Sequence, residues 1–83
     1  MEAYQQRMVE EYAQLKERLE KLHAWNIRQE VQLRKAADLP AAEAVKLPEL
    51  SYRHNLMTEQ ERAMNRYKEL LELRAALDGF DID

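Results

Sequence analysis

The sequence predicts an all-α protein in which a long amphipathic helix is followed by a second helix that folds back antiparallel to it as a helical hairpin. Strong helix formers dominate the 83 residues, which include only one Gly and two Pro. Apolar residues recur at spacings of three and four, while the β-branched runs and Gly/Asn turns of strands are missing. At this length we expect a single helical domain over residues 1–83.

The first helix is predicted over residues 2–37. Its apolar stripe consists of Met8, Tyr12, Leu15, Leu19 and Leu22. The next stripe position is Asn26, and the apolar residues that follow it lie at other positions. This shift predicts a bend, the end of the hairpin contact, or an Asn that sets the register of an oligomer seam. Leu39-Pro40 should end the helix, because a residue before Pro avoids the α region.

A connection bounded by two prolines is expected over residues 38–57. Residues 40–46 could add a short middle helix, with Pro40 at its first position. Pro48 should end that segment, and residues 51–55 are expected to form a loop.

The second helix is predicted over residues 58–78. The run Thr58-Glu59-Gln60-Glu61 has the form of a capping box, which opens a helix. Its expected inner face consists of Ala63, Met64, Tyr67, Leu70, Leu71 and Leu77. Gly79 suits the left-handed position after a helix and leaves a tail over residues 79–83.

The thin core of two helices predicts self-association. Two helices bury little apolar surface, and the predicted second helix is too short to cover the first. The simplest solution is a dimer whose hairpins pack into a helical bundle. The alternative is a compact monomer in which the first helix breaks near Asn26 and the middle segment supplies a third helix.

Composition excludes several classes of protein and partner. Without Cys, disulfide and Cys–zinc scaffolds are impossible, and a reducing cytoplasm fits. The N-terminus lacks the features of a signal peptide, and no apolar run approaches the roughly 20 residues that cross a bilayer. A net charge of -3 gives no general attraction to nucleic acid or anionic lipid. We expect a cytoplasmic protein with no membrane and no extended nucleic acid as partner.

Catalytic and metal-binding patterns are also missing from the sequence. His23 and His54 are the only histidines, and Ser51, the only Ser, forms no recognisable triad with them. The two Glu-x-x-His motifs of a di-iron bundle do not occur, since Glu20-x-x-His23 is the only one, and the single glycine cannot build a phosphate loop. We therefore predict no enzyme, no catalytic residue, no metal and no cofactor.

The segment from Lys21 to Lys35 is the best candidate for a binding site. Its four cations face a single acid, Glu30, and surround Trp25. An aromatic face beside positive charge suits an isolated nucleotide, through base stacking and phosphate pairing. The candidate ligand- or partner-binding residues are Lys21, Trp25, Arg28, Tyr52, Arg53 and His54. The alternative interpretation is a packed Trp25 among solvated charges.

Arg74 needs a partner, because it shares the expected inner face with Tyr67 and Leu71. Glu11 could supply it across an antiparallel contact, as could a second subunit. Structural pairing is the preferred role for these residues.

Two spaced motifs resemble a known family. The first is Arg7-x3-Glu11-x3-Leu15-x2-Arg18-x2-Lys21-Leu22-x2-Trp25, and the second is Gln60-x3-Met64-x2-Tyr67-x3-Leu71-x2-Arg74. Both resemble a family of small helical-hairpin proteins of phages and prophages, first named from a crAss-like phage, whose function is unsettled. Members usually have Phe where Trp25 stands and Lys where Arg18 stands. The connection between the motifs is longer here than in the usual member.

The resemblance implies a phage or prophage accessory protein in the host bacterial cytoplasm. By analogy with other small phage proteins, it would act by stoichiometric binding that inhibits or sequesters a host defence component. One alternative is an oligomeric sponge for a cyclic or ADP-ribose-type signalling nucleotide. Another is a structural coiled-coil adaptor.

Overall fold

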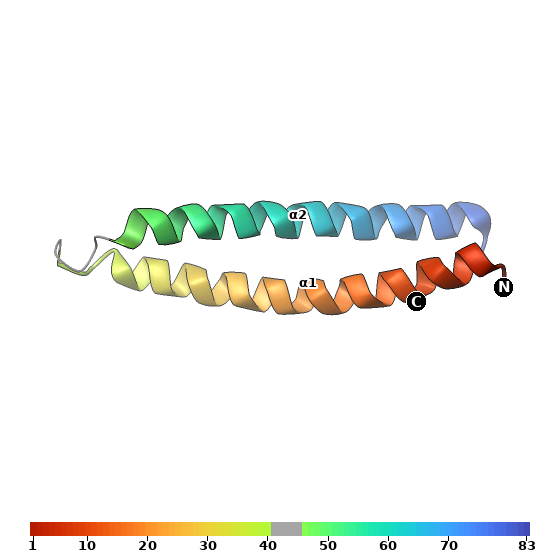
Figure 1. Cartoon of the computed structure of the whole chain (residues 1–83), viewed down its shortest axis with the longest axis horizontal. Helices are drawn as coiled ribbons and strands as arrows, with labels where there is room; N and C mark the ends of the chain where they lie inside the picture. The colour runs from red at the N-terminus through yellow and green to blue at the C-terminus, as the bar shows by residue number, and fades with distance from the viewer. Residues whose placement is uncertain (41–45) are drawn as a thin grey trace.

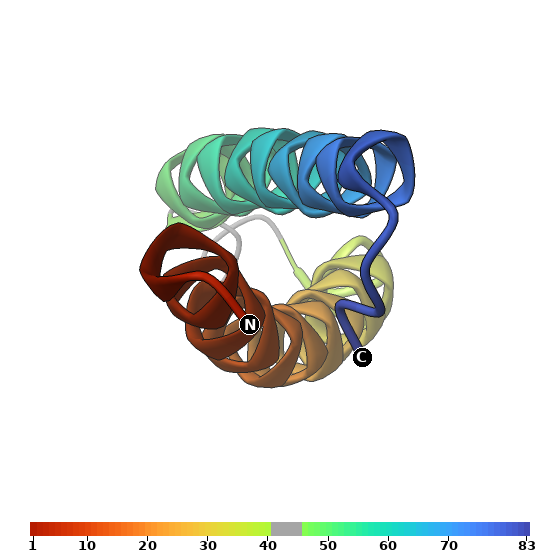
Figure 2. The same cartoon turned by 90° about the vertical axis from the view of Figure 1, so that its right-hand side faces the viewer.

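A computed structural model describes residues 1–40 and 46–83 as two antiparallel helices (Figure 1). Helix α1 spans Ala3–Ala36 and helix α2 spans Leu47–Asp78. The two helices lie side by side in both views and form a rod with extents of 59 × 15 × 15 Å (Figures 1 and 2). The predicted all-α helical hairpin is therefore confirmed. Within the described ranges, neither helix is long and apolar enough to cross a membrane.

Helix α1 is continuous through Asn26, so the break considered there does not occur. At its start the Gln5 side chain accepts a hydrogen bond of 3.0 Å from the Glu2 amide, which satisfies a free N–H. Arg34 and Lys35 in the last turn complement the negative end of the helix dipole. The compact monomer with a broken first helix is thus not the fold of this chain.

Helix α2 begins at Leu47, so the expected start at Thr58 is wrong. Pro48 lies in the first turn, where a missing N–H costs nothing, and Glu49 complements the positive end of the dipole. The capping-box pattern lies inside the helix, where the Thr58 hydroxyl donates 2.9 Å to the His54 carbonyl.

This early start corrects three further expectations. Residues 51–55 are helical rather than loop, and the connection is shorter than the expected 38–57. The helices contain 34 and 32 residues, so the expected mismatch in length disappears. Residues 41–45 lie outside the described part of the chain, and with them most of the short helix considered at 40–46.

Helix α2 ends at Asp78, as predicted, and the C-terminal tail then turns back. Gly79 adopts φ 75°, a left-handed conformation that favours glycine. The amide of Phe80 donates to the Ala75 carbonyl at 3.1 Å, which closes the helix end. The tail then runs from α2 toward α1 (Figure 2) and buries Ile82.

The apolar core lies at the end of the rod that carries both termini. It consists of Met8, Tyr12, Leu15, Leu19, Leu71, Ala75 and Ile82. Four of these are stripe residues that the periodicity of α1 predicted. Leu71 is completely buried, and Met64 packs beside it. The part of the rod beyond Leu19 buries Asn26, which is polar.

The predicted inner face of α2 is only partly correct. Leu71 is buried and Met64 is half-buried, but Ala63, Tyr67, Leu70 and Leu77 are exposed. The six expected residues cover too wide an arc of the helix to face a single neighbour.

Candidate functional site

A polar link joins the two helices at Asn26, just beyond the apolar core. The Asn26 side-chain amide donates to the Glu61 carboxylate at 2.9 Å and to the Met57 carbonyl at 3.2 Å. His23 Nδ1 lies 3.0 Å from the other Glu61 oxygen. The hydrogen bond from Asn26 and then that from His23 lower the pKa of Glu61. Asn26 therefore fixes the register within the hairpin, rather than at an oligomer seam.

An open hollow lies beside this link, on one flank of the groove between the helices. It has a volume of about 340 Å³ and is lined by Trp25, Arg53, Leu56 and Met57. Helix α1 supplies the half-buried Trp25, and α2 supplies the other three at helical spacing. The Arg53 guanidinium lies 3.1 Å from the Glu49 carboxylate, an exposed pair within one turn of α2. The hollow therefore combines an indole, apolar walls and one cation.

Two of the six predicted site residues, Trp25 and Arg53, line this hollow together. Lys21 and Arg28 are exposed one turn before and one turn after Trp25 on α1. Lys21 is engaged with Glu17 at 3.1 Å.

Tyr52 and His54 do not join Arg53 at the hollow. Successive residues of a helix are about 100° apart, so these neighbours point in different directions. Tyr52 is 65% exposed, and His54 is half-buried. The expected loop that would fold three adjacent side chains over Trp25 is absent, because this segment belongs to α2.

The sequence-based prediction missed Leu56 and Met57 as lining residues. They follow Arg53 by three and four positions, which is the spacing of one helix face. A helical assignment of this segment would have placed them beside Arg53. Pro48 predicts the end of a helical segment, whereas it lies in the first turn of α2.

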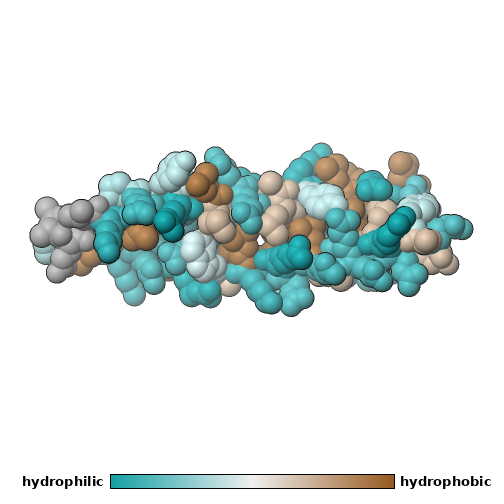
Figure 3. Space-filling model, in the orientation of Figure 1, coloured by the Kyte–Doolittle hydropathy of each residue, from teal (hydrophilic) through white to brown (hydrophobic). Residues whose placement is uncertain are grey.

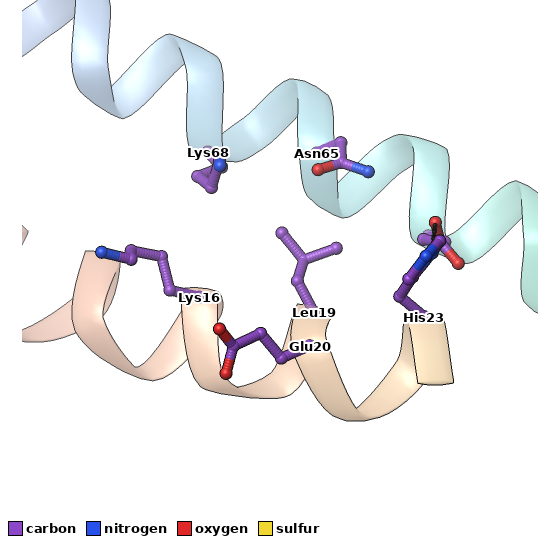
Figure 4. Close-up of a pocket in the computed structure, with 7 residues that line it drawn as sticks. Lys16, Leu19, Glu20, His23, Asn65 and Lys68 are labelled. Atoms are coloured by element: carbon purple, nitrogen blue, oxygen red, sulfur yellow. Dashed lines mark hydrogen bonds and ion pairs between the residues drawn. The ribbon is translucent and has the colours of Figure 1, made fainter. Parts of the chain in front are cut away.

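A second cleft lies on the opposite flank of the groove, since His23 and Trp25 are about 200° apart on α1. Its volume is about 360 Å³, and its lining residues are Lys16, Leu19, Glu20, His23, Glu61, Asn65 and Lys68. Leu19 points from α1 toward α2 at its floor (Figure 4). Its two Lys are matched by two Glu, so the cleft has no strong preference for an anion.

Lys16 in this cleft is already engaged by the C-terminal tail. Its ammonium lies 2.8 Å from the Asp83 carboxylate and 5.4 Å from the centre of the Tyr12 ring. The hydrogen bond to Asp83 raises the pKa of Lys16. The tail therefore uses Lys16 for docking, which favours a structural role for this flank.

Two tyrosine–carboxylate pairs also join the helices. The Tyr12 hydroxyl donates to Glu72 at 2.6 Å, and this bond raises the pKa of Tyr12 to about 12. The Tyr67 hydroxyl donates to Glu11, which raises the pKa of Tyr67. Glu11 thus bonds Tyr67 rather than the expected Arg74, although Arg74 lies close enough to act electrostatically on Tyr67.

The family model named Sequestin matches residues 2–77, which include all of α1, all but the last residue of α2 and both flanks of the groove. The chain belongs to the Sequestin family. No curated protein and no solved structure matches it. Membership supports the expected likeness to a family of small proteins. The name Sequestin is consistent with a binding, sequestering role rather than a catalytic one.

The described residues on the two flanks of the groove offer binding surfaces. In the described ranges, no three His, Asp or Glu side chains converge to hold a metal ion. His23 is engaged by Glu61, and the hollow at Trp25 contains neither a nucleophile nor an acid–base pair. The chemistry that these residues can supply is stacking, ion pairing and apolar contact.

Proposed function

We propose that this Sequestin protein acts by stoichiometric binding, without catalysis, and sequesters a host defence component. The proposed component is a signalling nucleotide of the cyclic or ADP-ribose type, captured in the bacterial cytoplasm by a phage or prophage protein. The observation that carries this proposal is that Trp25 and Arg53, from different helices, line one hollow. The family name supports sequestration as the mode of action.

The hollow has the chemistry that a nucleotide requires. The indole face of Trp25 can stack on a base, and the Arg53 guanidinium can pair with a phosphate. Lys21 and Arg28, one turn away on either side of Trp25, add positive charge. The volume of about 340 Å³ lies in the range of roughly 300–1,000 Å³ that is typical of small-molecule sites.

The ion pair of Arg53 with Glu49 does not prevent this binding. Their side chains are 69% and 66% exposed, and an exposed pair within a helix contributes little stability. A phosphate can replace the Glu49 carboxylate and form a stronger bidentate contact. Arg53 therefore needs little rearrangement to bind a ligand.

A host defence protein is the second candidate for the sequestered component. Tyr52 and Leu56 are 65% and 46% exposed on α2, and aromatic and apolar side chains are typical of protein interfaces. A structural adaptor would use similar faces. Pull-down from infected cells separates these cases from a nucleotide, because a protein target or a constant structural partner would be recovered in stoichiometric amount.

The deciding experiment is calorimetry against cyclic and ADP-ribose-type nucleotides. We expect the parent protein to release heat with one of them, and Trp25→Ala with Arg53→Ala to abolish it while the circular dichroism spectrum stays helical. Tyr4→Ala with Arg34→Ala is the matched control, because Arg34 also forms an exposed pair within a helix, with Glu30. Absence of heat and of a thermal shift with every nucleotide would remove the proposal.

A further inference from the structure

Helix α2 carries a second stripe, with six apolar and two charged residues, on the side away from α1. Its positions are spaced alternately by four and three residues and are Tyr52, Leu56, Glu59, Ala63, Arg66, Leu70, Leu73 and Leu77. All eight are exposed, with Leu73 at 59% and Leu77 at 88%. Apolar side chains recur along the edge of the rod formed by α2 (Figure 3).

This stripe is separate from the face of α2 that packs on α1. The residues toward α1 are Leu71 and Ala75, which are buried, and Glu61, which bonds Asn26. The exposed positions lie between these residues in the sequence and on another side of the helix. A helix with two such seams has one neighbour in this chain and room for a second.

We infer that the exposed stripe of α2 is the contact with a second copy of this chain, packed antiparallel. The stripe repeats every seven residues, which is the pattern of a coiled-coil seam. Placing Tyr52 opposite Leu77 of the second copy brings all eight positions into register about a two-fold axis. Leu56 then lies opposite Leu73, and the small Ala63 leaves room for Arg66.

Charge complementarity favours the antiparallel direction. In this register Arg62, on one flank of the seam, lies beside Glu69 of the second copy, and the symmetry makes this contact twice. Arg62 forms no ion pair among the described residues. A parallel pairing would instead oppose Glu59 to Glu59 and Arg66 to Arg66, and like charges at a seam are destabilising.

The size of the seam also fits a partner helix of the same length. It extends over residues 52–77, or about 38 Å at 1.5 Å per residue, along most of the rod. Two helices alone form a thin core, and a second hairpin would cover leucines that are now exposed. Leu56 belongs to both the seam and the hollow, so the second copy would lie along one edge of the hollow.

Light scattering of the full chain tests this inference. We expect the mass to be an even multiple of the 9.9 kDa chain, because a two-fold contact joins copies in pairs. Leu70→Glu with Leu73→Glu should halve that mass without loss of helicity, since both side chains are exposed. Ile27→Glu with Val31→Glu, which changes two exposed apolar residues of α1, should leave it unchanged.

The direction of pairing is tested by charge reversal at low salt. Arg62→Glu and Glu69→Arg should each raise the Kd of self-association several-fold, and the double variant should restore it. A monomeric parent, an odd multiple, or an unchanged mass in the Leu70/Leu73 variant would overturn the seam. A double variant as weak as the single ones would overturn the antiparallel register. None of these measurements involves a nucleotide, so they stand apart from the test of the proposed function.

Discussion

Asn26 on α1 donates a hydrogen bond of 2.9 Å to Glu61 on α2, and this bond crosses the hairpin beyond the end of its apolar core. Asn26 is 5% exposed, so an alternative register would leave its amide buried without this partner. If one helix slid along the other by a turn, leucine side chains could still pack against one another, but the Asn26 amide would lose its hydrogen-bond partner. The Asn26–Glu61 contact therefore specifies which residues of the two helices face each other, including Trp25 and the residues around Met57.

Replacing Asn26 by Asp should destabilise the hairpin. Asn26→Asp places a carboxylate against that of Glu61, and we expect a loss of about 2 kcal/mol at neutral pH. Urea unfolding followed by circular dichroism measures this loss of unfolding free energy. Asn55→Asp, the same change at an exposed position of α2, is the matched control and should cost much less. Equal losses in the two variants would mean that the Asn26–Glu61 bond does not contribute specifically.

Stability should fall at acidic pH through Glu61. Its folded pKa is lowered from 4.5, so its contribution is present above pH 4.5 and is lost as the pH falls through the folded pKa. Unfolding free energies measured between pH 7 and 3 should therefore decline below about pH 4.5. Glu61→Gln should flatten this decline, whereas Glu59→Gln at an exposed position should retain it. A parent and a Glu61→Gln variant with parallel profiles would contradict the prediction.

The Tyr12 hydroxyl should contribute stability that disappears in alkali. Its pKa is raised from 10.0 in the unfolded chain to about 12, so the neutral form favours folding below pH 10 and this contribution is lost between pH 10 and 12. Tyr12→Phe should cost about 1 kcal/mol at pH 8, and the difference from the parent should shrink above pH 10. Chemical denaturation at each pH provides the measurement. Tyr52→Phe, at an exposed position, should have the same unfolding free energy as the parent at each pH.

The C-terminal tail should contribute to the core through Ile82. Ile82 is 9% exposed and belongs to the buried cluster, so Ile82→Ala should lower the unfolding free energy by about 2 kcal/mol. Ile27→Ala changes the same side chain at a position that is 47% exposed and should stay within about 0.5 kcal/mol of the parent. Thermal and urea unfolding provide the comparison. An unchanged unfolding free energy in Ile82→Ala would show that the tail does not stay docked in solution.

The periodicity of α1 was sufficient to predict four of the seven core residues. Met8, Tyr12, Leu15 and Leu19 are buried as their spacing indicated, because one face of a long helix has one neighbour. On α2 the same argument failed, since Leu71 and Leu77 belong to different seams. A spacing of three or four does not show which of two apolar faces meets the partner helix.

The start of α2 could not be decided from local signals. Pro48 can end one helix or open another, and the pattern from Thr58 to Glu61 occurs within helices as well as at their ends. The candidate site depended on this decision, because the contact of Arg53 with the hollow of Trp25 requires a helix through residue 53. The register of that helix against α1 is set by Asn26 and Glu61, 35 positions apart. Ile82 was missed for a similar reason, since the burial of a short tail depends on distant residues.

The apolar core is concentrated at one end of the rod, the end that carries both termini (Figure 1). Beyond Leu19 the helices are joined by the polar bonds around Asn26 and, at the far end, by the chain connection between α1 and α2. Contacts of this kind open at lower free energy than packed apolar ones. The hollow at Trp25 therefore lies outside the apolar core, so a local rearrangement around a ligand there would leave intact the contacts that keep the chain folded.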